Sequence, residues 1–278
     1  MSDKIAVVTG ASSGLGRGIA RALGSRGFTV YVTGRTADQL EKAAEEISAN
    51  GGQGIALPCD HRNDDEVKAV FDRIKADSGH LDILVNNAAA VYPAELSAPG
   101  EFWEKDLKLA DMIDVGLRSH YVAAYYAAPL LIATGSGLIA HTSFYGARCY
   151  FHGPAYGAAK AGTDKMNFDM AVDLRPHGVA SVSIWPGIIL TDMLKHIPRE
   201  HLPAEVVAAL PTFETPEFTG LVIEHLWRSP ERMALSGQAV IGAELGQRFG
   251  IKDIDGKQPF SLEKKFGKPT NDFLVPNV

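Results

Sequence analysis

Short runs of β-branched and other apolar residues recur along the chain, separated by longer stretches with helical periodicity. The runs are Ile5–Thr9, Thr29–Thr33, Gly54–Leu57, Ile83–Val85, Leu138–His141, Ser181–Ile184 and Ala239–Ile241. Their apolar residues do not alternate strictly with polar ones, which is typical of strands in a parallel sheet covered on both faces. Connections of helix length are also what parallel pairing requires. The pattern therefore predicts a doubly wound α/β sheet of about seven mainly parallel strands, with helices on both faces.

The organisation of the chain indicates one domain. No internal repeat, low-complexity tract or Gly/Ser-rich linker divides the sequence. We expect a catalytic domain over residues 1–250, in which a Pro-containing variable segment at about 192–216 forms a substrate lid. The polar residues 251–278 are expected to form a tail packed on or near the same domain.

Composition narrows the class of partner. Apolar residues make up 46% and charged residues 22% of the 278 residues, as in an ordinary globular protein. The net charge of −6 arises from 27 basic and 33 acidic residues, and it gives no basic face for a nucleic acid or an anionic membrane. We therefore expect a small-molecule substrate as the partner.

Cysteine usage and the N-terminus predict a cytoplasmic protein. Cys59 and Cys149 fit neither a metal-binding spacing nor a disulfide framework, which indicates a reducing compartment. The N-terminal residues run straight into a short apolar stretch that ends in glycine, unlike a signal peptide. Residues 121–140 contain no charged residue, so a membrane span is the alternative to be weighed there. Gly135 and Gly137 favour a division into a helix and a strand.

A glycine-rich turn, Gly10-Ala11-Ser12-Ser13-Gly14-Leu15-Gly16, follows the first predicted strand directly, and helical periodicity then runs to Arg26. Gly10 permits a tight turn, Gly14 lets the backbone approach a pyrophosphate, and Gly16 lets the helix pack closely on the sheet. The amides at the helix N-terminus then face the anion. This context predicts a dinucleotide site of the Rossmann type.

Arg35 is the candidate determinant of the cofactor. It follows the second predicted strand, where a site specific for NAD would place a carboxylate to hold the ribose 2′-hydroxyl. A guanidinium can instead make a planar, charge-assisted contact with a 2′-phosphate. The alternative is a solvated arginine at the start of a helix. We expect NADP(H) to be preferred, with NAD(H) as the alternative.

Five segments resemble the short-chain dehydrogenase/reductase family in order and spacing over residues 5–193: the turn Thr9-Gly10-x-x-x-Gly14-x-Gly16, the segment Asn86-Asn87-Ala88, Ser143, the pair Tyr156 and Lys160, and the loop Pro186-Gly187-x-x-x-Thr191. Ser13 stands where family members often carry a second basic residue, and Ala89 replaces the family's glycine after Ala88. Together with Arg35, the resemblance implies cofactor contacts from Gly10, Ser12, Ser13, Gly14, Leu15, Gly16, Asp60, Asn87, Ala88, Tyr156, Lys160, Pro186, Gly187, Ile189 and Thr191.

Tyr156 and Lys160 are the candidate acid/base centre. They lie four residues apart in the predicted helix Ala155–Asp173, so both side chains share one face. A free phenol with a pKa of about 10 is a poor acid or base at neutral pH, and a nearby ammonium is expected to lower that pKa. A Tyr-x-x-x-Lys pair by itself is a common feature of surface helices. The resemblance makes it catalytic and assigns Ser143 to hold the substrate oxygen.

One position departs from the family pattern. The family usually has an asparagine in the helix before the fifth strand, where it holds a water between the lysine and solvent, and here that place falls on Gly116. The proton relay must then use water in the gap, Asp114 or His120, although both side chains also have ordinary structural explanations. The segments VGLRSHY, SIWPGI and GIKDIDG resemble a subgroup of NADPH-dependent reductases of apolar ketones that retain activity despite this glycine. The chain lacks that subgroup's longer hydrophobic C-terminal extension, so we expect no membrane association.

Other candidate sites are weaker. His196 and His201 flank Pro198 and do not form a helical metal pair, so we expect no metal. The segment Asp253-Ile254-Asp255-Gly256 lacks the further ligands of a calcium loop and is expected to be a turn. Cys149 and Tyr150 either line the substrate site or fill a loop.

The sequence therefore predicts an NADP(H)-dependent oxidoreductase that interconverts a carbonyl and a secondary alcohol on a small or apolar substrate, with Ser143, Tyr156 and Lys160 as its catalytic residues. The alternative is an NADP(H)-binding sensor or scaffold with little turnover, suggested by Gly116 and Ala89. Nucleotide-sugar epimerisation is disfavoured because a large C-terminal substrate domain is missing. The resemblance also implies a homodimer or homotetramer.

Overall fold

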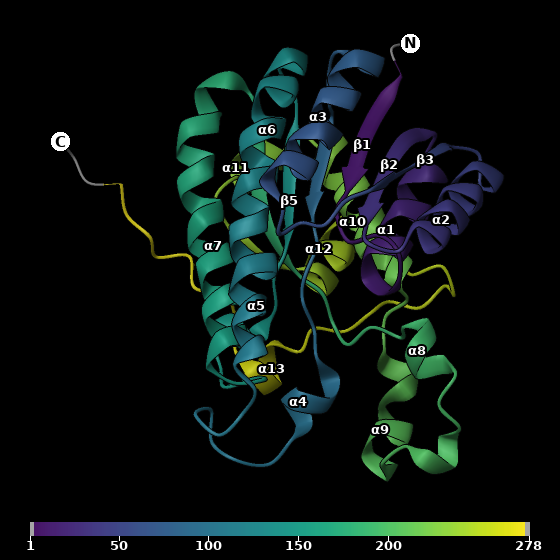
Figure 1. Ribbon diagram of the computed structural model, residues 1–278, viewed down its shortest axis with the longest axis vertical. Helices are drawn as coiled ribbons and strands as arrows, with labels where there is room; N and C mark the ends of the chain where they lie inside the picture. The colour runs from purple at the N-terminus through teal and green to yellow at the C-terminus, as the bar shows by residue number, and fades with distance from the viewer. Residues whose placement is uncertain (1–2, 276–278) are drawn as a thin grey trace.

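Seven strands form one sheet in the order β3-β2-β1-β4-β5-β6-β7, and every neighbouring pair is parallel. The computed structural model describes residues 3–275 (Figure 1). The strands are β1 (Lys4–Val8), β2 (Phe28–Gly34), β3 (Gln53–Pro58), β4 (Ile83–Asn86), β5 (Leu138–Thr142), β6 (Ala180–Trp185) and β7 (Ala239–Ile241). The seven predicted strands are confirmed to within one residue at each end, and the sheet proves to be wholly rather than mainly parallel.

The order of the strands reverses at β1. The chain builds outward from β1 through β2 to β3, then crosses to the other side of β1 and adds β4 to β7 in sequence. Val8 of β1 is paired with Val32 on one side and Val85 on the other. In open sheets of this kind, ligands bind in the crevice that forms at the carboxyl ends of the strands where the order reverses.

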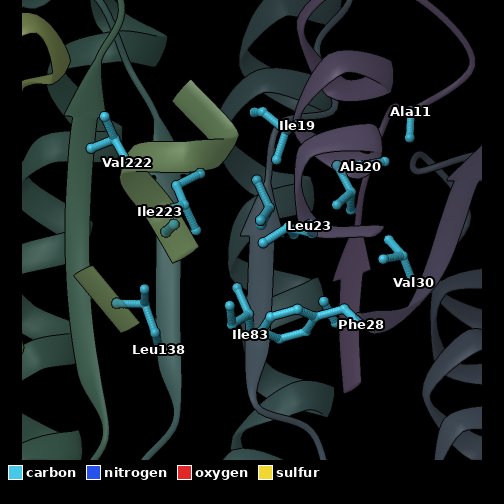
Figure 2. Close-up of a cluster of buried hydrophobic side chains, with 14 of the residues drawn as sticks. Ala11, Ile19, Ala20, Leu23, Phe28, Val30, Ile83, Leu138, Val222 and Ile223 are labelled. Carbon is cyan, nitrogen blue, oxygen red and sulfur yellow. The ribbon is translucent and has the colours of Figure 1, made fainter. Parts of the chain in front are cut away.

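One helical layer consists of α1 (Gly14–Gly24), α2 (Ala37–Ala49), α10 (Pro216–Arg228) and α12 (Gly242–Phe249). Apolar side chains of these helices pack on one face of the sheet, where Ile19, Leu23 and Ile223 meet Ile83 and Leu138 (Figure 2). The helices α1 and α10 approach closely because glycines lie between them: a Cβ on Gly18 would overlap Pro216, and a Cβ on Gly220 would lie 2.6 Å from Ala22.

The opposite layer consists of α3 (Asp64–Ser78), α6 (Ser119–Thr134) and α7 (Pro154–Leu174), whose buried side chains include Phe71, Leu131 and Leu174. The uncharged segment 121–140 is divided between α6 and β5, with Gly135 ending the helix at a φ of 65°. In residues 3–275, no helix is long and apolar enough to cross a membrane.

Smaller elements gather at the carboxyl end of the sheet. They are α4 (Pro93–Ser97), α5 (Asp111–Ile113), α8 (Asp192–Lys195), α9 (Ala204–Ala209) and α13 (Glu263–Phe266), whereas α11 (Arg232–Leu235) lies at the opposite end, just before β7. The segment expected to form a lid contains α8 and α9, which project from the body of the protein (Figure 1). Its two ends are joined at a narrow neck, where Glu214 pairs with Ile189 in an isolated parallel bridge.

The residues after α12 run back over the domain. Asp253 accepts hydrogen bonds from the backbone N–H and the hydroxyl of Thr215, at the N-terminus of α10. Further along, Phe266 packs against Tyr145 and Phe273 packs against Phe168 of α7. This segment therefore contacts both the lid neck and the helix that carries Tyr156.

Candidate active site

A cavity of about 740 Å³ opens at the carboxyl ends of β1, β2, β3, β4, β5 and β6. Every residue predicted to bind the cofactor or to act in catalysis lines it. They are Gly10, Ser12, Ser13, Gly14, Leu15, Gly16, Arg35, Asp60, Asn87, Ala88, Ser143, Tyr156, Lys160, Pro186, Gly187, Ile189 and Thr191. Residues from six strand ends thus meet around one space.

The glycine turn has the shape of a phosphate cradle. Gly10 and Gly14 have φ values of 66° and 56°, which side chains other than glycine rarely adopt. A Cβ on Gly16 would overlap the Gly10 carbonyl oxygen. No acidic residue stands in the first turn of α1, so its amides are open to an anion.

Asn87 braces this turn from the neighbouring strand. Its Nδ2 donates to the carbonyl oxygens of Thr9 at 2.9 Å and Gly10 at 3.2 Å. The Thr9 hydroxyl oxygen in turn accepts the backbone N–H groups of Asn87 and Ala88 at 2.9 and 3.0 Å. Ala89, which replaces the family's glycine, lies outside the positive-φ region, so its methyl group adds no backbone strain.

Two arginines and one aspartate form the charged wall of the cavity. Arg35 is exposed and makes no hydrogen bond or ion pair with other described side chains, whereas Arg62 pairs with Asp60 at 2.7 Å. Hydrogen bonds from Arg62 hold the pKa of Asp60 at about 2, and the charge of Arg35 adds to the effect. Asp60 was predicted as a cofactor contact, but its distance of 25 residues from Arg35 in the chain did not indicate that the two charges lie close together. Asp111 also lines the cavity, and its charge acts on Arg62, so two cations face two anions. Arg35 is the cation here without an ion pair among the described residues.

The pair Tyr156 and Lys160 lies on one face of α7, beside the end of β5. The buried Lys160 ammonium donates to the Thr142 carbonyl at 3.0 Å and lies 5.6 Å from the centroid of the Tyr156 ring. Burial lowers the pKa of Lys160 to about 8, while the charge of Asp164 opposes the fall. The arrangement therefore keeps the Lys160 ammonium over one face of the Tyr156 ring.

The expected direction of the Tyr156 pKa is wrong for this structure. Burial raises the pKa of the Tyr156 phenol above its ordinary value, whereas the spacing to Lys160 had predicted a fall. The reason is that desolvation of the phenolate outweighs the attraction of an ammonium that lies over the ring and donates elsewhere. The phenol is thus a proton donor at neutral pH.

Ser143 directly follows β5 and faces the same wall. Its backbone N–H donates to the Ile184 carbonyl at 2.9 Å, which fixes it against β6, and its hydroxyl donates to the Lys160 carbonyl at 3.3 Å. Ser143, Tyr156 and Lys160 are therefore brought together from a strand end and a helix.

Comparison with known proteins agrees with this geometry. A family model described as short chain dehydrogenase matches residues 4–202. The chain belongs to the short-chain dehydrogenase/reductase family. It is therefore an oxidoreductase of a family that binds NAD(P)(H).

The subgroup resemblance is also confirmed. Over 266 residues the chain is 40% identical to human dehydrogenase/reductase SDR family member 1, covering 92% of this chain and 85% of the human protein. A metagenomic short-chain oxidoreductase solved in complex with NADP is 29% identical, with a TM-score of 0.69 over 87% of this chain and 97% of the other. An actinorhodin polyketide ketoreductase variant with NADPH, 23% identical, shares the fold with a TM-score of 0.75, covering 87% of this chain and 97% of that one.

The family's relay asparagine is replaced by a glycine in a π-helical turn, Asp114–Arg118. Gly116 is buried, and a Cβ placed on it would have only the Ala159 methyl within 4 Å, at 3.7 Å. Asp114 is exposed, whereas His120 is buried, with Nε2 hydrogen-bonded to the Ala88 carbonyl at 2.9 Å. Its Nδ1 has no partner among the described residues. Of the two side chains considered for the relay, His120 alone points into the protein.

Sequence reasoning missed the aromatic end of the cavity. Phe144, Phe151 and His152 line it beside Tyr156, and His152 has a φ of 59°, the one positive value among the described non-glycine residues. The ring of His152 packs edge-on against that of Tyr156, with centroids 5.1 Å apart. The residues lie in a loop without periodicity, so the only sequence signal was their position between Ser143 and Tyr156.

The weaker candidates lie elsewhere. Cys149 and Tyr150 do not line the cavity: the Cys149 thiol donates to the Tyr145 carbonyl, and Tyr150 is exposed. Asp253 closes a turn with Lys257 rather than a calcium loop. Within residues 3–275, no cluster of His, Cys, Asp and Glu side chains could hold a metal, and His196 and His201 stay apart from the cavity.

Proposed function

We propose that the protein interconverts a carbonyl and a secondary alcohol on a small or apolar substrate, with NADP(H) as its preferred cofactor. The observation that carries this proposal is the meeting of two groups of residues in one cavity: a glycine cradle for a pyrophosphate, and the set Ser143, Tyr156 and Lys160. A structural helix pair would not require the strand-end serine and the cradle in the same space.

The cavity suits a nicotinamide dinucleotide. The open amides at the start of α1 and the turn that a Cβ would fill suit the pyrophosphate. Pro186, Gly187 and Thr191 would hold the nicotinamide end. When bound, the reduced nicotinamide supplies a hydride.

The protein's own groups handle the oxygen and its proton. Because burial raises the pKa of Tyr156, the phenol carries a proton that it can give to the substrate oxygen. Ser143 donates a hydrogen bond to the same oxygen and fixes its position. Lys160, held by Thr142, keeps a positive charge beside the phenolate that forms, and the reverse oxidation uses the same groups.

Two features support the finer parts of the proposal. Arg35, which makes no ion pair with the described residues, favours a 2′-phosphate over a bare hydroxyl. At the other end, the side chains of Phe144, Phe151 and Ile188 favour an apolar substrate.

The test is NADPH oxidation across a panel of ketones and aldehydes, for the unaltered protein and for Tyr156→Phe. Turnover should be lost in the variant while the dissociation constant for NADPH stays within about twofold, because the ring remains and only the proton donor is removed. Full activity of the variant would overturn the assignment of Tyr156. Tight NADPH binding by the unaltered protein without turnover on any substrate would favour a sensor or scaffold.

A further inference from the structure

Asp164 lies one helical turn beyond Lys160 and two beyond Tyr156, so the three side chains share one face of α7. It is buried, at 5% exposure, yet it does not line the cavity. Buried carboxylates are uncommon in proteins unless they are paired or serve a function. The contacts of Asp164 should therefore explain why a carboxylate is buried at this position.

Those contacts join the helix to the strand that positions Ser143. The carboxylate accepts the Ser183 hydroxyl at 2.5 Å and the Trp185 indole N–H at 3.0 Å. Both donors belong to β6, and Ile184 between them accepts the backbone N–H of Ser143. Asp164 thus fixes the spacing between α7, which carries Tyr156 and Lys160, and the backbone that holds Ser143.

We propose that Asp164 is a positioning residue of the active site, whose carboxylate holds Ser143 in register with α7 and stabilises the buried ammonium of Lys160. This inference rests on the proposed roles of Ser143 and Lys160. Asp164 itself touches neither substrate nor cofactor and acts through these two residues.

The charges agree with this arrangement. Burial raises the pKa of Asp164 to about 6, against the hydrogen bonds from Ser183 and Trp185 and the charge of Lys160, which lower it. Burial lowers the pKa of Lys160 to about 8 against the charge of Asp164. Between these values both groups are ionised, and each offsets part of the cost of burying the other.

The other titratable groups packed nearby stay neutral over that range. Burial lowers the pKa of His141 on β5 to about 3 and lowers that of His120 on α6 well below its ordinary value. Burial raises the pKa of Tyr145, which packs on Trp185, to about 12. Ser183 and Trp185 are the described residues of β6 that face Asp164, and neither carries a charge. Asp164 is therefore the charged group that opposes the effect of burial on the pKa of Lys160.

The first experiment follows the Lys160 Cε signal by NMR as a function of pH, with Lys160→Met to assign it. The unaltered protein should show a main transition near pH 8 and a smaller inflection near pH 6, as Asp164 ionises. In Asp164→Asn, the inflection should vanish and the main transition should move down by about one pH unit, because the neighbouring anion is gone. An unaltered protein without the inflection, or a variant with an unchanged transition, would overturn the proposal.

The second experiment measures the pH profile of kcat/KM. The alkaline limb should move to lower pH in Asp164→Asn, and at a fixed pH above the limb kcat/KM should fall roughly tenfold if the limb moves by about one pH unit. Asp164→Glu, which keeps the charge, should restore the limb, and Asp173→Asn on the exposed side of the same helix should leave the profile unchanged.

Ser183→Ala keeps the anion and removes one hydrogen bond. If it shifts the limb as far as Asp164→Asn does, the role is structural only. Because the NMR titration needs no turnover, failure of the proposed reaction and failure of this inference are distinguishable.

Discussion

The side-chain amide of Asn271 hydrogen-bonds both backbone groups of Ala239: its Oδ1 accepts the N–H at 2.7 Å and its Nδ2 donates to the carbonyl at 2.9 Å. Ala239 begins β7, the last strand of the sheet. The tail thus occupies an edge that would otherwise present unpaired backbone groups to other chains.

Removal of this contact should weaken the edge. Asn271→Ala is expected to lower the free energy of unfolding by about 1 kcal/mol, since two partly exposed hydrogen bonds are lost. Urea denaturation followed by circular dichroism measures the change, with Asp272→Ala as the exposed neighbouring control. Equal stability of the two variants would show that water replaces the amide without loss.

Arg35 should decide between the two cofactors. Arg35→Ala is expected to weaken NADPH binding by roughly 10- to 100-fold, the range for loss of a hydrogen bond to a charged group. NADH binding should change little, because no phosphate stands at the 2′ position. Fluorescence titration of both cofactors gives the ratio, and Arg35→Lys tests whether charge alone suffices. A parallel loss for both cofactors would contradict the assignment.

Two helical glycines should respond in opposite ways to the same substitution. A Cβ on Gly116 meets only the Ala159 methyl at 3.7 Å, so Gly116→Ala should keep or raise stability, by up to about 1 kcal/mol. A Cβ on Gly18 would overlap Pro216, so Gly18→Ala should cost about 1–3 kcal/mol. Urea unfolding of the pair measures both. A destabilised Gly116→Ala would mean that the π-helical turn itself needs glycine.

The strands and the cavity wall could be predicted because each has a local signal. An apolar run such as Ile83–Val85 indicates its strand by itself, and a glycine turn between a strand and a helix predicts a phosphate cradle. The fold then brings these strand ends to one edge. The motifs predicted the parts of the site separately, and the topology of the sheet brings these parts together.

What the sequence left open depends on burial and on partners distant in the chain. The raised pKa of Tyr156 follows from desolvation, which a four-residue spacing does not reveal. Asp164 looks like one more polar residue of a helix until its partners on β6 are known. Phe151 becomes part of the site through packing against Phe266 of the tail, more than a hundred residues later. Such pairings require the tertiary structure.

Glu214 at the neck of the lid should make stability depend on pH. Its backbone pairs with Ile188 and Leu190, at 2.9 and 2.8 Å, so it joins the two ends of the lid. The side chain is 2% exposed, and neither carboxyl oxygen has a hydrogen-bond partner among the described residues. Burial, with a smaller contribution from the charge of Asp253, raises the pKa of Glu214 from 4.5 to about 8. The protonated acid therefore fits the folded protein.

The contribution of Glu214 to stability should be complete below about pH 4.5 and should be lost as the pH rises toward about 8, because in that window the unfolded chain holds fewer protons than the folded one. The loss is on the order of a few kcal/mol. Glu214→Gln should remove this dependence, so that the difference in unfolding free energy between the variant and the unaltered protein grows from pH 5 to pH 8.5. Glu205→Gln, an exposed position in the lid, is the matched control. A difference that stays constant over this range would mean that Glu214 is ionised and solvated in the folded protein, and that the neck does not respond to its protonation.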